Sequence, residues 1–582
     1  MNSARMIFKY WLKSKNKFIG ESILHLFSSM FYIIYPIFIG RMVGTLNPNR
    51  SIAANVSELL FNFFFVLLFA SLRYIFSRAA RLRGAEVSSS ATYHLRTDIS
   101  NAIYRQSFAY FDKTETGQLI ARATSDVEET GQIFGSGLNL TLQSSFQLAG
   151  LIIGFIIFGR ELMFVLLIAV GVSFFLSFII AKKLKPIFFE TRESFGEITN
   201  TIRENIVGAQ VVRLFNTQTK EYHKFLKNNK RFYEASVDSV KYNSYYMPII
   251  QSLIGILTIL TLFLGGVRIV EGTMALDALI TLLSYVVALS FPLMMLGQLM
   301  LVYIQADAAL TRIGEVLDSV PDIKDLPDAI PITSLKGDIE FDNVSFGYTH
   351  DHRILKNISF KLPSGKILAI LGTTGSGKST IINLLPRFYE LNDGCIKIDE
   401  LDVRKYIIKD LRKNIGIVSQ ETFLFDKSIA ENIAYGVENA SRNNIIEAAK
   451  IANLHDFIVS LPKGYDSIVG ERGTRLSGGQ KQRLSIARAL IINPKILILD
   501  DSTSSVDVET EYKIQKALTE IMKKTTTIII TQRISTIRGA DYILILDRGR
   551  AVGFGTHDKL LSSNVLYKQI YETLYQKQKT KV

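Results

Sequence analysis

The chain has 582 residues, more than a single domain usually holds. Hydrophobic residues make up 48% of it, and its mean hydropathy of +0.21 is high for a soluble protein that is also 21% charged. The single cysteine, Cys395, excludes an intramolecular disulfide and provides no metal-ligand pattern. The net charge of +14 is compatible with nucleic-acid binding. Long apolar runs up to about residue 305 explain it better as membrane topology, so we expect no nucleic-acid partner.

Six apolar stretches precede residue 305, and each is long enough to cross a bilayer about 30 Å thick, which takes roughly 20 helical residues. The first is the weakest because Glu21 and His25 interrupt it. We place the six spans near residues 18–40, 59–79, 138–159, 162–181, 248–270 and 275–299.

Basic residues are concentrated in the two long connections between these spans, residues 80–137 and 182–247. The connection between the third and fourth spans contains one basic residue, Arg160. Because basic connections stay in the cytoplasm, the sequence predicts that both long connections and both chain ends are cytoplasmic.

A short amphipathic segment precedes the first span. Ile7, Phe8, Trp11 and Leu12 recur at helical spacing among lysines, which predicts a helix lying in the headgroup region of the membrane. The segment Met1–Lys17 lacks an apolar core followed by a small-residue cleavage site, so we expect no cleavable signal.

The two long connections are predicted to be helical, since structureless loops of that length are uncommon. Apolar residues recur on one face in each connection, and turns are expected near residues 111–117 and 213–218. The residues that indicate these helices are Leu95, Ile99 and Ile103 in the first connection and Ile198, Ile202 and Ile206 in the second.

The remainder of the chain begins with a segment rich in Asp, Pro and Lys, residues 318–331, which is typical of a linker. From Gly337 onward, strands and helices alternate, which predicts an α/β domain. A short buried strand, Ile367–Leu371, is followed at once by the loop Gly-Thr-Thr-Gly-Ser-Gly-Lys-Ser (372–379) and by a helix from about Lys378.

This order of strand, glycine-rich loop and helix is the context that a phosphate-binding loop requires. Its backbone N–H groups turn toward the phosphates of ATP, the Lys378 ammonium reaches the β- and γ-phosphates, and the Ser379 hydroxyl binds Mg²⁺. A second buried strand, residues 495–500, ends in Asp500, which is expected to hold Mg²⁺ through water. The predicted ATP contacts of the loop are Gly372, Thr373, Thr374, Gly375, Ser376, Gly377, Lys378, Ser379 and Thr380.

A second glycine-containing motif, Leu-Ser-Gly-Gly-Gln, lies about one hundred residues further along. Ser477 and the glycine amides open a helix, which makes another anion-binding N-terminus. With this motif the chain resembles the ABC proteins, from about Phe8 to Tyr571. In that family the motif reaches the γ-phosphate held by the opposite subunit, so the resemblance implies a dimer. The motif residues are Leu476, Ser477, Gly478, Gly479 and Gln480.

Further segments match the ABC exporter pattern. The resemblance implies that Tyr348 stacks on adenine and that Gln420 contacts Mg²⁺ and the coupling helices. It also implies that residues 469–473 and 505–507, including Asp507, contact the partner subunit. In the membrane half, the segments that match the two coupling helices, each expected to sit on an ATP-binding domain, are residues 111–127 and 204–215.

Two positions depart from the family pattern. Asp501 stands after Asp500 where the family has the Glu that positions or deprotonates the attacking water, and Gln532 stands where the family has a His that contacts the γ-phosphate. The Asp501 carboxylate is one methylene shorter, and Gln532 cannot become cationic. These changes affect the site on the chain's own phosphate loop, whereas the intact Ser477 motif serves the partner's site. The chain thus resembles the degenerate-site subunits of heterodimeric bacterial multidrug exporters.

The predicted fold is an all-α six-span transmembrane domain (residues 1–320), a linker (321–336) and an α/β phosphate-loop ATP-binding cassette (337–582). The predicted function is ATP-driven export of a hydrophobic or amphipathic substrate, drug or lipid-like, across the cell membrane by a heterodimer. The alternatives are a homodimeric exporter with slow hydrolysis by Asp501, and a nucleotide-gated regulator or channel. An importer is disfavoured because the membrane and ATPase parts are fused in the exporter order.

Overall fold

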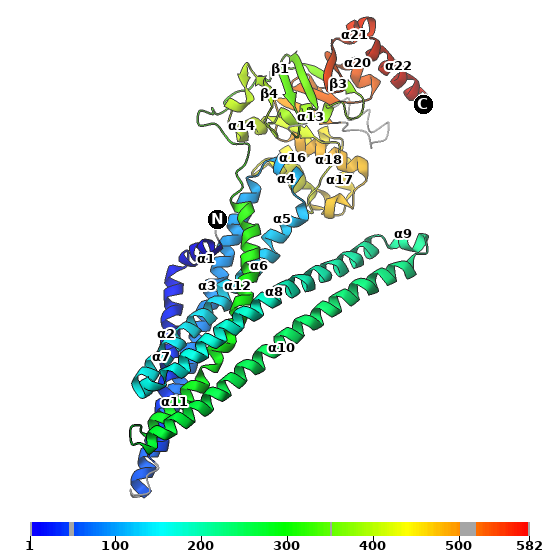
Figure 1. Ribbon diagram of the computed structural model, residues 1–582. Helices are drawn as coiled ribbons and strands as arrows, with labels where there is room; N and C mark the ends of the chain where they lie inside the picture. The colour runs from blue at the N-terminus through cyan, green and yellow to red at the C-terminus, as the bar shows by residue number, and fades with distance from the viewer. Residues whose placement is uncertain (1–2, 46–51, 350–351, 501–519, 580–582) are drawn as a thin grey trace. The chain divides into compact units, whose positions relative to one another are not determined.

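The computed structural model describes residues 3–45, 52–349, 352–500 and 520–579 (Figure 1). The chain divides into two compact units. The first contains Met1–Arg105 and Glu115–Ser319, and the second contains Gln106–Thr114 and Val320–Val582. The short segment Gln106–Thr114 therefore packs with the second unit, although in sequence it lies between two helices of the first.

The described part of the first unit is helical. A π-helical turn, Ile133–Gly137, joins α6 to α7, and a single 3₁₀ turn, Arg160–Leu162, joins α7 to α8. The helices are α1 (Ser3–Leu12), α2 (Lys15–Gly44), α3 (Ile52–Tyr104), α5 (Thr116–Ala123), α6 (Ser125–Gln132), α7 (Leu138–Gly159), α8 (Met163–Val207), α9 (Ala209–Leu214), α10 (Gln218–Val270), α11 (Leu276–Ala288) and α12 (Ser290–Leu317).

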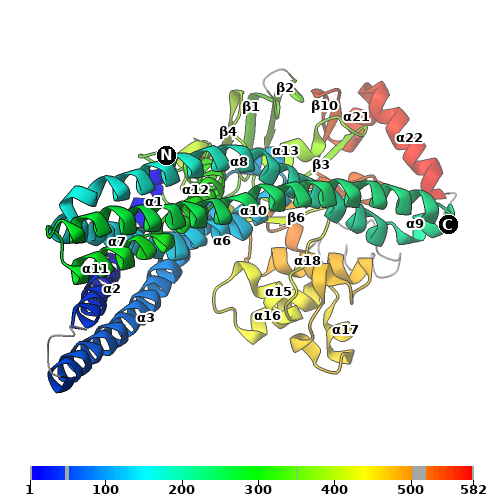
Figure 2. The same cartoon turned by 60° about the horizontal axis from the view of Figure 1, so that its bottom comes forward.

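The two long connections are helical, as predicted. The first consists of the end of α3 followed by a short helix at Phe108–Lys113, by α5 and α6, and by the π-helical turn. The second consists of the ends of α8 and α10, which lie side by side and are joined through α9 (Figure 2). The apolar residues that indicated these helices differ in burial. Leu95, Ile99 and Ile198 are buried, whereas Ile202 and Ile206 are exposed in this single chain.

Five helical stretches among the described residues are long and apolar enough to cross a membrane. The third of them contains the predicted span 138–159 and the beginning of the predicted span 162–181, so the count of six remains a prediction. The five stretches are Lys15–Gly44, Asn55–Tyr104, Thr116–Leu176, Pro248–Val270 and Leu276–Leu317.

The two ionisable residues that interrupt the first predicted span face the helix bundle. Glu21 and His25 are 0% and 1% exposed. His25 Nε2 lies 2.8 Å from Asn139 Oδ1 of α7 and 3.9 Å from Glu21 Oε1. Polar side chains inside a membrane segment face the bundle or a cavity because lipid offers them no hydrogen bond. The polar side of α2 therefore lies toward the other helices of the bundle.

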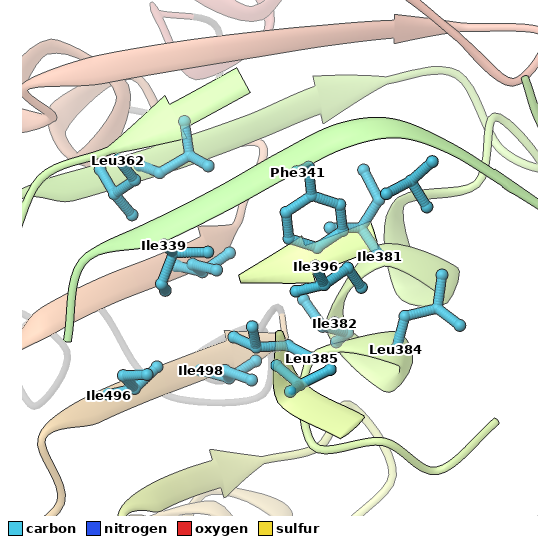
Figure 3. Packing of buried hydrophobic residues seen from close by; sticks show 14 of the residues in the cluster. Ile339, Phe341, Leu362, Ile381, Ile382, Leu384, Leu385, Ile396, Ile496 and Ile498 are labelled. Atoms are coloured by element: carbon cyan, nitrogen blue, oxygen red, sulfur yellow. The ribbon is translucent and has the colours of Figure 1, made fainter. Parts of the chain in front are cut away.

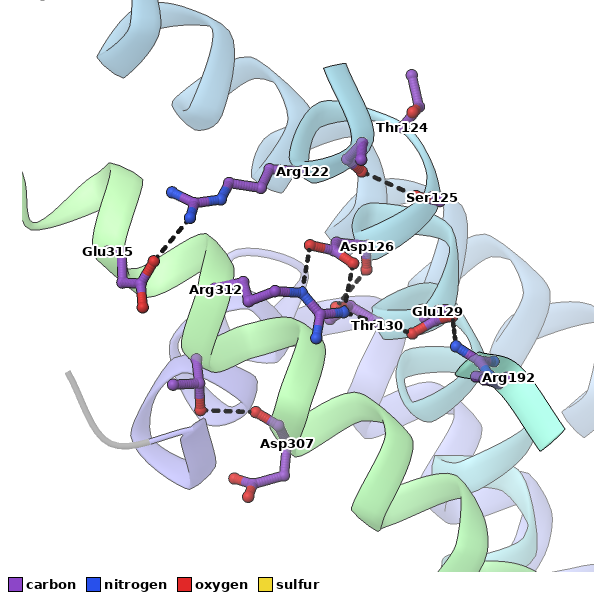
Figure 4. Close-up of polar contacts among 12 residues, drawn as sticks. Arg122, Thr124, Ser125, Asp126, Glu129, Thr130, Arg192, Asp307, Arg312 and Glu315 are labelled. Atoms are coloured by element: carbon purple, nitrogen blue, oxygen red, sulfur yellow. Dashed lines mark hydrogen bonds and ion pairs between the residues drawn. The ribbon is translucent and has the colours of Figure 1, made fainter. Parts of the chain in front are cut away.

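Ion pairs join α5, α6, α8 and α12 within the first unit (Figure 4). The Arg312 guanidinium donates twice to Asp126, from Nε to Oδ2 at 2.9 Å and from Nη2 to Oδ1 at 2.6 Å. Arg122 Nη2 lies 2.8 Å from Glu315 Oε2, and Arg192 pairs with Glu129. The Asp126 side chain is only 8% exposed, so losing its partner would leave a nearly buried charge unpaired. This cluster therefore holds α6 against α12.

The second unit contains two sheets. The antiparallel sheet has the order β2-β1-β4-β5, and the larger sheet has the order β10-β9-β3-β8-β7-β6, parallel from β9 to β6. The strands are β1 (Ile339–Phe346), β2 (Leu355–Leu362), β3 (Ile367–Gly372), β4 (Asp393–Ile398), β5 (Leu401–Asp402), β6 (Ile415–Val418), β7 (Ile496–Asp500), β8 (Thr526–Ile530), β9 (Tyr542–Asp547) and β10 (Arg550–Gly555). The α-helices are α4 (Phe108–Lys113), α13 (Lys378–Leu384), α14 (Ile408–Lys413), α15 (Ile429–Ile433), α16 (Arg442–Ile451), α17 (His455–Ser460), α18 (Gly478–Leu490), α20 (Ile534–Gly539), α21 (His557–Ser563) and α22 (Val565–Lys579).

The main core of this unit lies around α13 (Figure 3). Ile381 and Leu385 are fully buried, and they share one hydrophobic cluster with Phe341 of β1, Ile396 of β4 and Ile498 of β7. Because α13 is packed on the strands of both sheets, the loop that precedes it is held in place at both of its ends. Burial of this apolar cluster therefore positions the phosphate-binding loop.

Candidate nucleotide-binding site

Four neighbouring parallel strands end at one edge of the larger sheet, in the order β3-β8-β7-β6. Ligands of parallel α/β sheets bind at the carboxyl ends of the strands. Here β3 leads into the loop 372–379, β8 is followed by Gln532, β7 ends in Asp500, and β6 is followed by Gln420. A cavity of about 710 Å³ is lined by the loop together with these three side chains. The structure thus brings together residues that lie up to 160 positions apart in the sequence.

The loop requires glycine at specific positions. Gly377 has φ +99°, and a Cβ there would lie 2.5 Å from Leu355 Cδ2. A Cβ on Gly372 would lie 2.3 Å from the Leu546 carbonyl oxygen. Both contacts are shorter than van der Waals distance, so a side chain at either position would displace the loop from β2 or β9. The glycines therefore allow the backbone to turn its N–H groups toward a ligand.

Lys378 lies at the mouth of this loop. Its ammonium donates to the carbonyl oxygens of Gly372 at 3.0 Å and Thr373 at 2.7 Å. Burial lowers the pKa of the Lys378 ammonium, and the nearby carboxylate of Asp500 opposes that shift. The ammonium is therefore oriented by neutral carbonyls, which polyphosphate oxygens can replace with a stronger, charge-assisted contact.

The predicted Mg²⁺ ligands are brought together in part. Ser379 Oγ donates to Asp500 Oδ2 at 3.4 Å, and Gln420 lines the same cavity. The described residues contain no cluster of three His, Cys, Asp or Glu side chains that would hold a metal alone. Mg²⁺ is usually held by one or two carboxylates together with phosphate oxygens and water, so a hydroxyl, a carboxylate and an amide fit this ion when ATP is bound.

Some of the remaining predicted nucleotide contacts line this cavity and others do not. Thr373, Thr374, Gly375 and Thr380 line the cavity, whereas Ser376 is buried beneath the loop and does not. Tyr348 also lies outside the lining residues; its ring packs edge-on against Tyr389, and its hydroxyl is 3.5 Å from Thr380 Oγ1. Tyr348 remains 40% exposed, which leaves one ring face available for stacking.

The Leu-Ser-Gly-Gly-Gln motif forms the start of α18. Ser477 is the N-cap: its Oγ accepts from the Gln480 N–H at 3.3 Å, while Gln480 Oε1 accepts from the Ser477 N–H at 2.8 Å. Ser477 and Gly478 are exposed, and none of the residues Leu476, Ser477, Gly478, Gly479 and Gln480 lines the phosphate-loop cavity. Within one chain, the motif is therefore separate from the loop that it is expected to complete in a dimer.

The structure describes one of the two residues that depart from the family pattern. Gln532 lines the cavity beside the phosphate-binding loop. Asp501 and Asp507 lie outside the described residues. Gln532 follows the end of β8, the strand next to β3, and its position beside the loop follows from the parallel register that pairs Ile370 with Ile530.

The C-terminal helix α22 also lines the cavity, which the sequence reasoning missed. Gln569, Ile570 and Thr573 of α22 are among the lining residues. They recur at intervals of one and three residues, so a helical stripe was detectable from the sequence. The surface that this stripe covers was not, since α22 reaches the loop only because it packs on the sheet with α20.

The helix α4 packs on the second unit next to α13. The Phe108 and Phe388 rings lie 4.4 Å apart, and the Tyr389 hydroxyl donates to Asp112 Oδ2 at 2.8 Å. Burial and this hydrogen bond raise the pKa of the Tyr389 hydroxyl above its usual range. Since Tyr389 also touches Tyr348, α4 is connected through two tyrosines to the edge of the nucleotide cavity.

We expect Tyr389→Phe to loosen α4 without unfolding the second unit. Removing one hydrogen bond to a carboxylate should raise amide hydrogen exchange in residues 106–114 about five- to tenfold. Tyr406→Phe is the matched control, because it removes a tyrosine hydrogen bond of 2.9 Å, to the Ile398 carbonyl, elsewhere in the same unit. Equal exchange in the two variants would show that the Tyr389 contact does not hold α4.

A polar cavity of about 700 Å³ lies within the first unit. Gln143 of α7 and Gln298 of α12, two polar residues of the predicted spans, both line it. Arg81 and Asn139 add further hydrogen-bonding groups, and Phe291 adds an aromatic ring. The cavity therefore offers polar and apolar contacts side by side.

Comparison with known proteins agrees with this geometry. The family model described as "ABC transporter transmembrane region" matches residues 22–293, and that described as "ABC transporter" matches residues 355–504. The ATP-dependent lipid A-core flippase of Syntrophus aciditrophicus (strain SB) is 36% identical over 487 residues, which are 83% of this chain and 80% of that protein. The uncharacterized ABC transporter ATP-binding protein YknU of Bacillus subtilis (strain 168) is 36% identical over 588 residues, 99% of this chain and 98% of that protein.

A solved structure of a bacterial Atm1-family ABC exporter with ATP bound is 28% identical, with a TM-score of 0.85 over 96% of this chain and 99% of that chain. Helical transmembrane and α/β nucleotide-binding regions follow one another in the same order in both. The chain therefore belongs to the ABC exporters, as a half-transporter in which a multi-pass transmembrane region is fused to an ATP-binding domain.

Proposed function

We propose that this half-transporter is the degenerate-site subunit of a heterodimeric ABC exporter in the cell membrane, with its ATP-binding domain and both chain ends in the cytoplasm. The proposed transmembrane domain comprises residues 1–320, the linker residues 321–336 and the nucleotide-binding domain residues 337–582. The partner is a second half-transporter that carries the catalytic Glu and the switch His which this chain lacks.

The observation that carries the proposal is the separation of two functional parts within one chain. The phosphate-binding loop and Gln532 line one cavity, whereas the exposed Ser477 motif does not. Each complete ATP site then requires one loop and one motif from different chains. The altered groups act in the site on this chain's loop, and the intact motif acts in the partner's site, so the two sites are chemically unequal.

The expected chemistry differs accordingly. Asp501 is one methylene shorter than Glu, and a displacement of ~1 Å of a catalytic group costs on the order of 10²-fold in rate. Gln532 can donate a neutral hydrogen bond to the γ-phosphate. It carries no positive charge that would stabilise the negative charge developing there during hydrolysis. Mg²⁺, when bound by Ser379, Gln420 and Asp500, would neutralise phosphate charge in both binding and hydrolysis. We therefore infer that this site binds ATP and hydrolyses it slowly.

ATP binding would close the two nucleotide-binding domains, and hydrolysis at the partner's site would reopen them. The helix α4, which contacts Tyr389 and Phe388 and lies between α3 and α5 in the chain, would transmit this movement to the membrane helices. The inward- and outward-open states differ in their affinity for nucleotide, and that difference in affinity is what shifts their populations.

The proposed cargo is amphipathic and drug- or lipid-like. The name of the 36% identical lipid A-core flippase supports a lipid-like molecule. The cavity lined by Gln143, Gln298 and Phe291 supports a molecule that has both a polar and an apolar part. A purely polar substrate would make no favourable contact with the aromatic and aliphatic side chains that also line the cavity.

The first test is Lys378→Ala, which removes the loop's full positive charge toward the phosphates. We expect ATP affinity at this chain's site to fall about 10- to 100-fold, as for the loss of a charge-assisted hydrogen bond. Nucleotide titration of the purified chain measures it. Lys361→Ala on β2 is the control, because this side chain is 61% exposed and does not line the cavity. Unchanged affinity for Lys378→Ala would reject the assignment of the loop.

ATPase assays of the purified chain alone separate the heterodimer from its alternatives. Robust turnover by this chain without a partner would favour a homodimer that uses Asp501. Nucleotide-gated ion current without ATP-driven flux would favour a channel. Low turnover that rises on addition of a partner with an intact Glu is the result that the proposal requires.

A further inference from the structure

A second large cavity in the first unit, of about 610 Å³, is lined by residues of α1, α7, α8 and α12. One face of α1 lines it through Ala4, Ile7, Phe8 and Trp11, which follow the spacing of a helical stripe. The other walls come from the π-helical turn before α7, from α8 and from α12, and they are almost entirely hydrocarbon. The cavity is therefore shaped for an apolar chain.

The polar side chains at this cavity are those of Trp11, Thr141, Lys182 and Tyr303, and Lys182 is the charged one. Lys182 of α8 lines it, and no ion pair to Lys182 is found among the described residues. Trp11 Nε1 is buried and has no hydrogen-bond acceptor in the described part of the chain. The Thr141 hydroxyl is already used, since it donates to the Gly137 carbonyl at 2.7 Å. No carboxylate is among the lining residues, so the cavity complements a negatively charged group.

Lys182 and Trp11 indicate the depth at which the cavity lies in the bilayer. Lys182 directly follows the predicted span 162–181, and tryptophan prefers the membrane–water interface. The helix α1 is fixed there from its other side, because Tyr10 Oη donates to Asp98 Oδ2 at 2.8 Å and Lys13 Nζ donates to the same oxygen at 2.9 Å. The wall that α1 contributes is therefore held in place at the level of the lipid phosphates.

We propose that this cavity binds an anionic phospholipid, with its phosphate on the Lys182 ammonium and with one acyl chain along the apolar walls, which include the Trp11 ring. An acyl chain gains little by leaving the bilayer, since lipid tails are as apolar as the side chains that line the cavity. Selectivity must therefore come from the headgroup. The charge of Lys182 favours a headgroup with net negative charge over a zwitterionic one.

The chain contains its own reporter, because Trp11 is its only tryptophan. The full-length protein is placed in phosphatidylcholine vesicles that contain increasing fractions of dibrominated phosphatidylglycerol or dibrominated phosphatidylcholine. Bromine quenches tryptophan fluorescence only at short range. We expect the brominated phosphatidylglycerol to reach half-quenching at a mole fraction about fivefold lower, as one well-placed lysine provides. The Trp11→Phe variant has no tryptophan of its own, so it measures the background fluorescence of any co-purifying partner.

Two variants test the assignment to Lys182. Lys182→Gln should remove the preference for phosphatidylglycerol, and Lys182→Arg should keep it. Lys183→Gln is the matched control, because the Lys183 ammonium lies over the Tyr242 ring at 6.0 Å and does not line the cavity. Equal quenching by the two brominated lipids, or an equal loss of preference in Lys182→Gln and Lys183→Gln, would overturn the proposal. The measurement needs neither ATP nor turnover, so its failure would leave the proposed heterodimer with unequal ATP sites unaffected.

Discussion

Ser477→Arg is expected to remove nearly all ATP turnover of the assembled heterodimer, a loss of about 10²-fold or more. In the proposed dimer, Ser477 and the following amides face the γ-phosphate bound by the partner's loop, which is the competent site. An arginine there occupies that space and removes the N-cap of α18, whose Oγ now accepts from the Gln480 N–H. Asp501→Asn in the same chain should change turnover much less, because it alters the slow site.

A matched control separates chemistry from folding. Ser441 is the N-cap of α16, where its Oγ accepts from the Asn444 N–H at 3.2 Å, and it is far from the motif in sequence. Ser441→Arg therefore removes a comparable cap, worth about 1 kcal/mol of helix stability, and should leave turnover nearly intact. Steady-state ATPase rates of the three variants decide the question. Inactivity of Asp501→Asn with full activity of Ser477→Arg would contradict the unequal-site proposal.

Asp501→Glu combined with Gln532→His is expected to convert the slow site into a hydrolytic one. The longer carboxylate regains about one methylene of reach, and histidine regains a contact with the γ-phosphate that can carry charge. Gln532 already lines the cavity beside the phosphate-binding loop, so the new imidazole enters at the required place. Either change alone should do less, since both groups act on one transition state and such effects are not additive.

The readout is ATP turnover in a complex whose partner has its catalytic Glu changed to Gln. Turnover well above that of the unmodified chain in the same complex is the expected result. Lys378→Ala added to the double variant should abolish the gain, which places the new activity on this chain's own loop. Turnover no higher than background would mean that residues other than Asp501 and Gln532 keep this site slow. Transport need not improve, because a second fast site would reopen the dimer early.

The class of each region of the chain could be predicted from local sequence patterns. Apolar runs long enough for a bilayer predicted membrane helices, since span length is a property of the local chain. The strand, the glycine-rich loop and the helix from Lys378 were also local, and the structure places β3 and α13 at the expected residues. The motif at Ser477 was likewise visible as a helix start, because capping depends on residues three positions apart.

Which of these parts meet depends on packing between distant segments, which local patterns do not show. Gln420, Asp500 and Gln532 face one cavity because the sheet order β3-β8-β7-β6 does not follow the chain order, and sheet order depends on long-range packing. The same reason explains why α22 lines that cavity and why α4 packs with the second unit. Glu21 and His25 weakened the first span as a sequence pattern, yet they are buried against α7, because a helix in lipid must turn its polar side chains toward other helices. Local patterns thus specified the elements and their chemistry, whereas packing between distant segments specified the sites.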